Sequence, residues 1–417
     1  MRRLIFLISL ALLLAACGSR IVSTPTPTAT PAPTSTPRPT PTATPIPNCP
    51  VPNANATWIA PDIFDHYPDA IQKYLNQGGP IDQLTTLLRN ASSITTTLGG
   101  VTAFDLTGDG APETIVSIYY PASQVQPPSG LLLIYGCAQQ KINLLYTDKA
   151  VDPESMTQIM KVDNLIGAAR GGQIATLKSI CGAHTCFSAL DVLGWNGSTL
   201  VSLLAEPLNL PSASYVLSKK ESEAAYHIEA QAGLIGSTGA GPQRTETQLI
   251  KWNGAQFAKV SSTLSPIVYR IHAIYEADDA FAKGDYKTAI DWYGRAITDN
   301  SLKDWLTEIK YSKAHDRGTL TAYARFRLLV IGVLRGDANA HDQLDQLSNN
   351  FPPDNPDSNI QQMALVFWNT YQATQDVKAA CAAADAFAND KYQIIDNLGL
   401  FGYANRAYTS DDMCPIK

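Results

Sequence analysis

One segment of this sequence is incompatible with any helix or sheet. Residues 24–47 read TPTPTATPAPTSTPRPTPTATPIP, and nine of the 27 prolines in the 417-residue chain lie there. Each proline lacks an amide N–H and holds φ near −65°, so the tract can form neither a helix nor an internal strand. We expect an extended stalk that rises about 3.1 Å per residue and reaches roughly 70 Å. A ligand for a proline-recognition domain is the alternative interpretation.

The N-terminal residues have the pattern of an export signal. Arg2 and Arg3 precede an apolar run at residues 4–16, which is too short to span roughly 30 Å of hydrocarbon. The run ends in the letters LAAC at residues 14–17, which resemble the lipobox of bacterial lipoproteins. The resemblance implies cleavage before Cys17, lipidation of Cys17 and extracytoplasmic anchoring at the cell surface. An ordinary signal peptide that precedes a cysteine by chance is the alternative.

The charge balance restricts the partners. The net charge is −6, and residues 1–47 contain four basic residues and no acidic ones, so the remainder carries −10. Nonspecific nucleic-acid binders neutralise phosphates with Lys and Arg, so we expect no nucleic-acid partner. The same surplus of acid disfavours electrostatic binding to a membrane surface. The expected partners are the membrane, through the lipid, and a protein or glycan of unknown identity.

Six cysteines follow the predicted lipidation site. An even number of cysteines outside the cytoplasm favours disulfides, and six thiols allow fifteen pairings. Cys181 and Cys186 are close enough in sequence to close a local loop, and the predicted C-terminal helical region contains both Cys381 and Cys414, which leaves Cys49 and Cys137. A metal site formed by Cys181, His184 and Cys186 is the alternative, but a structural zinc site usually needs four ligands.

The middle of the chain has the pattern of a β-rich block behind a short helical cap. Helical spacing of apolar residues occurs between 61 and 93. Short apolar runs bounded by Gly, Pro or Asp then predict strands, at 101–106, 114–120, 131–135, 142–146, 174–179, 188–195, 199–204, 227–232, 246–252 and 257–261. A strand, an aromatic residue, a tight turn and another strand recur around Tyr135, Trp195 and Trp252. Three related β-units are therefore expected between about 101 and 262, and the Asn-Gly pairs after the two tryptophans predict two-residue hairpin turns.

The first unit contains a candidate calcium loop, DLTGDGAPE at residues 105–113. It resembles the calcium loop of FG-GAP/VCBS-type propeller blades, as in integrin α-chains. The resemblance implies one Ca²⁺ held by Asp105, Thr107, Asp109, Glu113 and the Ala111 carbonyl, which are hard oxygen donors around a glycine-containing turn. In the second unit, residues 163–167 retain only the acid at the first position of the loop, Asp163. The third unit lacks the loop. A metal-free turn is the alternative interpretation.

The last third of the chain is predicted to be helical. Helical patterns cover residues 267–283, 286–298, 320–334, 341–349, 360–374 and 377–389. Residues 277–297 resemble a tetratricopeptide repeat, with small residues at Ala277, Ala289 and Ala296 and an aromatic at Tyr293. The resemblance implies stacked helix pairs with a concave peptide-binding face. The sequence departs from that motif at Ala273 and Ser301, where Trp and Pro are usual.

Catalytic motifs do not occur in the sequence. It contains no nucleophile elbow, H-E-x-x-H or C-x-x-C motif, and the glycine-rich stretch 236–242 lacks the Lys-Ser/Thr of a phosphate-binding loop. We therefore predict that the chain is not an enzyme but a binding or scaffold protein. A polysaccharide-active enzyme that uses paired carboxylates on the β-domain is the alternative, because the fold alone can bring such carboxylates together.

These patterns predict an α+β multidomain protein with four parts. They are a lipoprotein signal peptide (1–17), a disordered stalk (18–48), an antiparallel β-repeat domain, partly propeller-like, with a helical cap (49–265), and an all-α domain of tetratricopeptide type (266–417).

Overall fold

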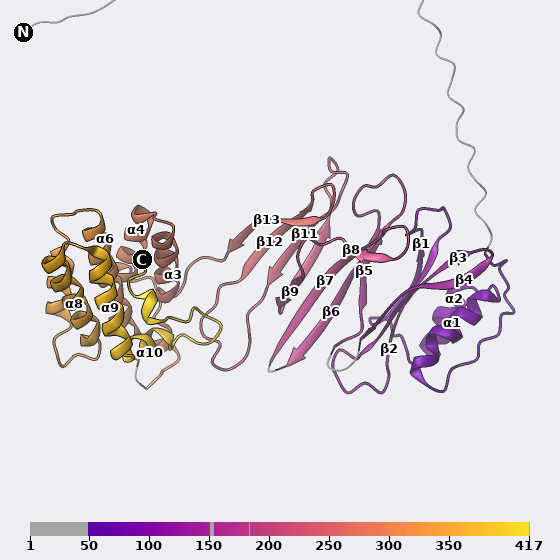
Figure 1. Cartoon of the computed structure of the whole chain (residues 1–417). Coiled ribbons are helices and arrows are strands. Elements are labelled where there is room, and N and C mark those ends of the chain that lie inside the picture. The colour runs from indigo at the N-terminus through magenta and orange to yellow at the C-terminus, as the bar shows by residue number, and fades with distance from the viewer. Residues whose placement is uncertain (1–48, 151–153, 183, 313, 417) are drawn as a thin grey trace, which may run out of the picture. The chain divides into compact units, whose positions relative to one another are not determined.

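The computed structural model describes residues 49–150, 154–182, 184–312 and 314–416 (Figure 1). The predicted signal peptide, the lipidation site Cys17 and the stalk lie outside these residues. The described residues form three antiparallel sheets and a helical C-terminal region, so the protein has a mixed α+β fold. None of their helices combines the length and apolarity needed to cross a bilayer.

The described chain begins with a pair of short helices that cover the first sheet. After the 3₁₀ turn η1 (Phe64–His66), helix α1 (Tyr67–Asn76) and helix α2 (Ile81–Asn90) are separated by a Gly-Gly-Pro turn. Helical spacing puts Ile71, Tyr74 and Leu75 of α1 on the buried side. They share a core with the first sheet, as a cap would.

Each of the three sheets contains a four-stranded meander of consecutive strands (Figure 1). The first contains β1 (Gly100–Phe104), β2 (Glu113–Tyr119), β3 (Gly130–Ala138) and β4 (Lys141–Ala150). The second contains β5 (Gln158–Asp163), β6 (Gln173–Gly182), β7 (Thr185–Trp195) and β8 (Leu200–Ser202), and β9 (Leu208–Pro211) pairs with β7. The third contains β10 (Ser214–Ser218), β11 (His227–Ala232), β12 (Glu246–Trp252) and β13 (Phe257–Leu264).

The recurring aromatic residue lies in the third strand of each meander, in β3, β7 and β12. The prediction of two-residue turns after the tryptophans is wrong. Trp195 pairs with Leu200, and Trp252 pairs with Phe257, so each loop has four residues. The asparagine side chain explains the longer loop: Asn196 Oδ1 accepts from two backbone amides, and Asn253 Oδ1 does the same.

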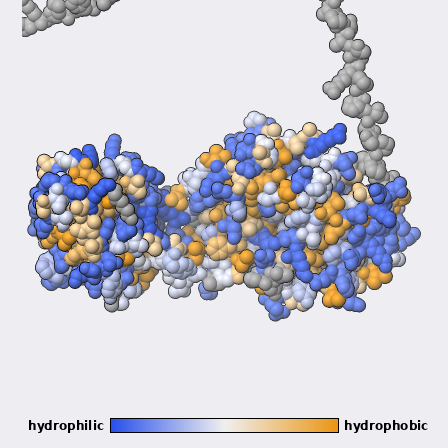
Figure 2. Space-filling model, in the orientation of Figure 1, coloured by the Kyte–Doolittle hydropathy of each residue, from blue (hydrophilic) through white to orange (hydrophobic). Residues whose placement is uncertain are grey.

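The C-terminal region begins six residues after β13 and is built from helices that share one core. They are α3 (Arg270–Ala282), α4 (Tyr286–Thr298), α5 (Trp305–Glu308), α6 (Asp316–Leu334), α7 (His341–Asn350), α8 (Ser358–Thr374), α9 (Val377–Asp390), α10 (Gln393–Gly399) and the 3₁₀ turn η2 (Ser410–Asp412). The apolar stripe predicted on α6 is buried, including Tyr323 and Phe326. Hydrophilic residues cover most of the face seen in Figure 2, where apolar residues form scattered patches.

The six described cysteines form three pairs. Cys49 pairs with Cys137 of β3, Cys181 pairs with Cys186 across the β6–β7 hairpin, and Cys381 of α9 pairs with Cys414. These are the three pairs that the positions of the cysteines in the sequence suggested. The Cys181–Cys186 bond leaves neither sulfur as a thiolate in this structure, which disfavours the alternative of a Cys/His metal site there.

Candidate functional site

The C-terminal segment returns to the third sheet after α10 and packs against the glycine-rich loop 236–242. The backbone amides of Tyr403 and Ala404 donate to the carbonyls of Gly239 and Ala240, at 3.1 and 3.2 Å. A Cβ atom on Gly241 would lie 1.6 Å from the Phe401 carbonyl oxygen, so a glycine is required at this contact. The loop that connects β11 and β12 therefore serves as a docking surface for the C-terminal segment.

Helix α3 makes polar contacts with the same part of the sheet region. His272 Nε2 lies 3.2 Å from the Pro242 carbonyl oxygen. Because a carbonyl can only accept, Nε2 carries the proton. Arg244 donates to the Ser265 carbonyl at 2.7 Å and to Glu276 at 2.5 Å. These contacts join residues on both sides of the connection between β13 and α3.

A cleft of about 440 Å³ lies where these elements meet, and we call it the junction cleft. It is lined by the ends of β9, β11 and β13, by Gln243, Arg244 and Glu246, by α3 and by residues 404–406. Leu210, Pro211 and Leu264 give it apolar surface, while α3 and the C-terminal segment supply polar groups. A volume in the range of 300–1,000 Å³ with a few convergent polar groups is typical of small-ligand sites.

Two ion pairs lie at the polar side of the junction cleft. Glu276 and Asp279 are one turn apart on α3 and are contacted from different segments. Glu276 pairs with Arg244, and Asp279 forms a short ion pair with Arg406. The Arg406 guanidinium also lies 5.3 Å from the centre of the Tyr275 ring, so it covers that ring. The cleft is therefore charged, but these charges are balanced within the chain.

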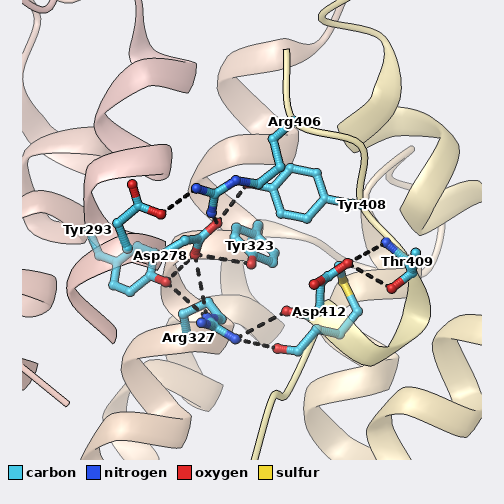
Figure 3. A network of polar contacts seen from close by, with 10 residues as sticks. Asp278, Tyr293, Tyr323, Arg327, Arg406, Tyr408, Thr409 and Asp412 are labelled. Carbon is cyan, nitrogen blue, oxygen red and sulfur yellow. Dashed lines mark hydrogen bonds and ion pairs between the residues drawn. The ribbon is translucent and has the colours of Figure 1, made fainter. Parts of the chain in front are cut away.

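A buried polar network adjoins the junction cleft, because Asp278 lies 3.7 Å from Arg406, which lines the cleft. Figure 3 shows this network. Asp278 lies at its centre and accepts hydrogen bonds from Tyr293, Tyr323 and Tyr408, the last at 2.7 Å. Arg327 Nε is 3.7 Å from Asp278 and donates to the Tyr293 hydroxyl at 2.9 Å. These side chains come from α3, α4, α6 and the C-terminal segment, so the network joins the helices to the segment that forms the cleft.

Burial governs the protonation of this network. It raises the pKa of Tyr293, Tyr323 and Tyr408 well above the usual value. Burial also lowers the pKa of Arg327, but the neighbouring Tyr323, Tyr293 and Asp278 more than offset this, so the pKa is raised overall. The phenols remain neutral and the guanidinium charged at neutral pH. We therefore assign the network a structural role.

The predicted calcium ligands are close in sequence, but their carboxylates face the loop's own backbone. Asp105 accepts from the amides of Gly108 and Gly110, and the buried Glu113 accepts from those of Leu106 and Thr107. Burial, the largest cause, raises the pKa of Glu113.

Thr107 donates its hydroxyl to Glu113, and Asp109 accepts from the Ala111 amide. Among the described residues, no group of three or more His, Cys, Asp or Glu side chains is arranged to hold a metal. The chemistry of the donors suits Ca²⁺, but their arrangement in the structure does not form a coordination shell. Calcium binding stays a prediction, and calorimetric titration tests it: heat on adding Ca²⁺ supports a site, and no heat contradicts it.

The second β-unit contains a counterpart of this loop that has no acid. Gln173 is the first residue of β6, and its side-chain oxygen accepts from the amides of Leu165 and Ile166. Glu113 is the first residue of β2 and accepts from two amides of its own loop in the same way. This correspondence aligns Asn164 with Asp105. The prediction that Asp163 retains the first acid of the loop is therefore wrong: Asp163 ends β5 and accepts from Tyr226 at 2.6 Å.

Comparisons with protein-family models, with curated proteins and with solved structures find no match. The junction cleft was not predicted from the sequence. Its polar residues come from positions 243–279 and 404–406, which no local pattern connects. The only local signal was the glycine-rich stretch 236–242, which lacks the Lys-Ser/Thr of a phosphate-binding loop.

Proposed function

We propose that this chain is an exported, lipid-anchored surface protein with a non-catalytic binding or scaffold function, and that its partner occupies the junction cleft. The lipobox-like sequence at Cys17 and the proline-rich stalk support export and anchoring. The three disulfide pairs fit an oxidising compartment outside the cytoplasm. Labelling cells with a palmitate analogue tests the anchor: incorporation that is lost in Cys17→Ser supports it, and no incorporation contradicts it.

Local geometry supports both family resemblances. The three four-stranded meanders, with an equivalent loop in two of them, are what related propeller-type blades would contain. In the helical region, α3 and α4 pack as a pair across the Gly284-Asp285 turn. Ala277, Ala289 and Ala296 are fully buried, as small residues at a tetratricopeptide helix crossing would be. We propose that the domains belong to these structural types.

The junction cleft is the observation that carries the binding proposal. Its walls are held in place by hydrogen bonds between the β11–β12 loop and the C-terminal segment, and by the network around Asp278. Arg244, Glu276, Asp279 and Arg406 are held in ion pairs rather than left available for proton transfer. A preformed cleft with balanced charges suits recognition better than acid–base catalysis.

Occlusion of the cleft tests this proposal. Ala404 lines the cleft and Ala386 lines a separate depression beside α9, so Ala404→Trp and Ala386→Trp are matched additions of one bulky ring. The full chain is solubilised in mild detergent and incubated with its own envelope fraction. We expect Ala404→Trp to lose at least tenfold in retention of envelope material and Ala386→Trp to behave as the wild type. Equal retention by both variants, each with a wild-type melting curve, would contradict the proposal.

One observation favours the alternative, a polysaccharide-active enzyme. Asp191 of β7 lies near Asp148 of β4, and burial followed by the Asp148 charge raises its pKa. Lys178 contacts Asp148 at 3.0 Å. Two carboxyl groups with unequal environments are what a glycosidase needs. Release of reducing sugar from envelope polysaccharide that Asp191→Asn abolishes would support this alternative, and no release by the wild type would contradict it.

A further inference from the structure

The junction cleft is lined by two residues that have an unpartnered buried polar atom. In the described residues as a whole, three buried side-chain N or O atoms lack a hydrogen-bond partner. Two of them, His272 Nδ1 and Tyr275 Oη, belong to residues that line the cleft. The two rings are one turn apart on α3, and their centres are 6.2 Å apart.

An unpartnered buried polar atom has lost its hydrogen bonds to water without a replacement, so such atoms need an explanation. The Tyr275 hydroxyl lies toward the backbone of Arg406 but does not reach hydrogen-bonding geometry. His272 is only 4% exposed. Two costly groups side by side at one cleft indicate a partner that is not part of this chain.

The chemistry of the two atoms restricts that partner. Nε2 of His272 donates to Pro242, and burial lowers the pKa of the ring, so the imidazole is neutral and Nδ1 is an acceptor. The Tyr275 hydroxyl can donate or accept. The ligand must therefore offer a hydrogen-bond donor to His272 Nδ1 and, beside it, a group that can donate to or accept from the Tyr275 hydroxyl. Two neighbouring hydroxyl groups meet both requirements.

The charges of the cleft disfavour an ionic ligand. Arg244 and Arg406 are each paired with an acid of α3. A charged ligand would have to compete with one of these pairs for its counter-ion, whereas an uncharged ligand needs no counter-ion from either pair. The volume of about 440 Å³ suits a small ligand or the end of a chain rather than a folded protein surface.

We infer that the junction cleft binds an uncharged, hydroxyl-rich ligand of the saccharide class, and that His272 Nδ1 and the Tyr275 hydroxyl contact its hydroxyl groups. The inference rests on the proposed function. Both atoms are shielded from solvent in the structure, and Arg406 lies over the Tyr275 ring with its side chain 34% exposed. Entry of the sugar therefore requires Arg406 to move away from the ring.

Calorimetric titration of the full chain with neutral trisaccharides tests the inference, with chitotriose, cellotriose and maltotriose as probes. N-acetylated, C-amidated tripeptides serve as uncharged probes without sugar hydroxyls. We expect at least one trisaccharide to bind and the peptides not to bind. Tyr275→Phe should weaken that binding at least tenfold without lowering the melting temperature, because the lost hydroxyl has no partner in the chain.

Tyr226→Phe is the matched control. It removes a hydroxyl that donates to Asp163 at 2.6 Å and so has its partner within the chain. Tyr226 precedes β11 and does not line the cleft, which Ala232 lines at the other end of that strand. It should lower the melting temperature and leave sugar binding unchanged. Tyr275→Phe with a lowered melting temperature and unchanged binding would assign the hydroxyl a purely structural role and overturn the inference.

The outcomes separate this inference from the proposed function. Binding of the tripeptides alone overturns the saccharide inference and leaves the binding function standing. The same holds if no probe binds while Ala404→Trp still abolishes envelope retention. Unchanged retention in Ala404→Trp overturns the proposed function itself.

Discussion

The Tyr408 hydroxyl donates a 2.7 Å hydrogen bond to Asp278, which lies 130 residues earlier in the chain, and both side chains are buried. This bond joins the C-terminal segment to the first helix of the helical region. Since the same segment forms one wall of the junction cleft, the bond links the stability of the helical core to the shape of the cleft (Figure 3).

Removing Tyr408's hydroxyl and removing Asp278's carboxylate should lower the free energy of unfolding by different amounts. Tyr408→Phe removes one donor to a carboxylate and should cost about 1.5–3 kcal/mol. Asp278→Ala leaves Arg327 buried without its counter-ion and should cost about 3–5 kcal/mol. Urea unfolding of the full chain measures both. A smaller loss for Asp278→Ala than for Tyr408→Phe would contradict the central position of Asp278 in the network.

Glu113 should be replaceable by glutamine but not by alanine. Gln173 already fills the equivalent position with an amide oxygen that accepts from two backbone amides. We therefore expect Glu113→Gln to change the free energy of unfolding by less than about 1 kcal/mol. Glu113→Ala should cost about 2–5 kcal/mol, because the Leu106 and Thr107 amides lose their acceptor. Equal losses for the two variants, measured by urea unfolding, would show that the negative charge matters.

Substitutions at two glycines of the β11–β12 loop distinguish the cost of backbone conformation from the cost of a packing clash. Gly239 and Gly241 have φ of +83° and +84°, but only a Cβ on Gly241 would meet the Phe401 carbonyl. Gly239→Ala should cost about 1–2 kcal/mol from the left-handed backbone alone. Gly241→Ala should cost about 1–3 kcal/mol more, because the C-terminal segment must shift. Similar melting temperatures for the two variants would show that the segment is not docked there.

His272 should make stability depend on pH below neutrality. Burial lowers its pKa, and the Arg244 charge acts in the same direction. The unfolded state therefore binds a proton at a higher pH, about 6.5, than the folded state does. Above about pH 6.5 the ring is neutral in both states and does not oppose folding. The free energy of unfolding decreases as the pH falls from about 6.5 towards the lower pKa of the folded state. Urea unfolding at pH 7.5 and 5.0 should show a larger loss for the wild type than for His272→Gln, and identical losses would contradict this assignment.

The periodic parts of the fold could be predicted from the sequence. The six longer helices of the C-terminal region and most strands follow apolar periodicity, because one side of each packs on a core. The short helices α5 and α10 were not predicted. Three short strands, β5, β9 and β10, were missed, since each has only four to six residues with no complete alternation of buried positions. The Asn-Gly turns were misjudged because the asparagine side chain, and not only the backbone, closes the loop.

The candidate site could not be predicted because its residues meet only in the folded chain. His272 and Tyr275 occur in a helix whose pattern is that of a core, and nothing local shows that their polar atoms lack partners. The predicted calcium ligands, by contrast, form a local motif that is visible in the sequence. In the structure the backbone amides of the same loop donate to their carboxylates, and calcium binding stays a prediction.

Retention of envelope material by the Ala404→Trp variant tests the central claim most directly. A ring at position 404 would fill the cleft between α3 and the third sheet. With the full chain, and with Ala386→Trp as the reference, we predict at least a tenfold loss of retention for Ala404→Trp alone at an unchanged melting temperature. Retention by Ala404→Trp equal to that of the wild type would show that the junction cleft is not where this protein binds its partner.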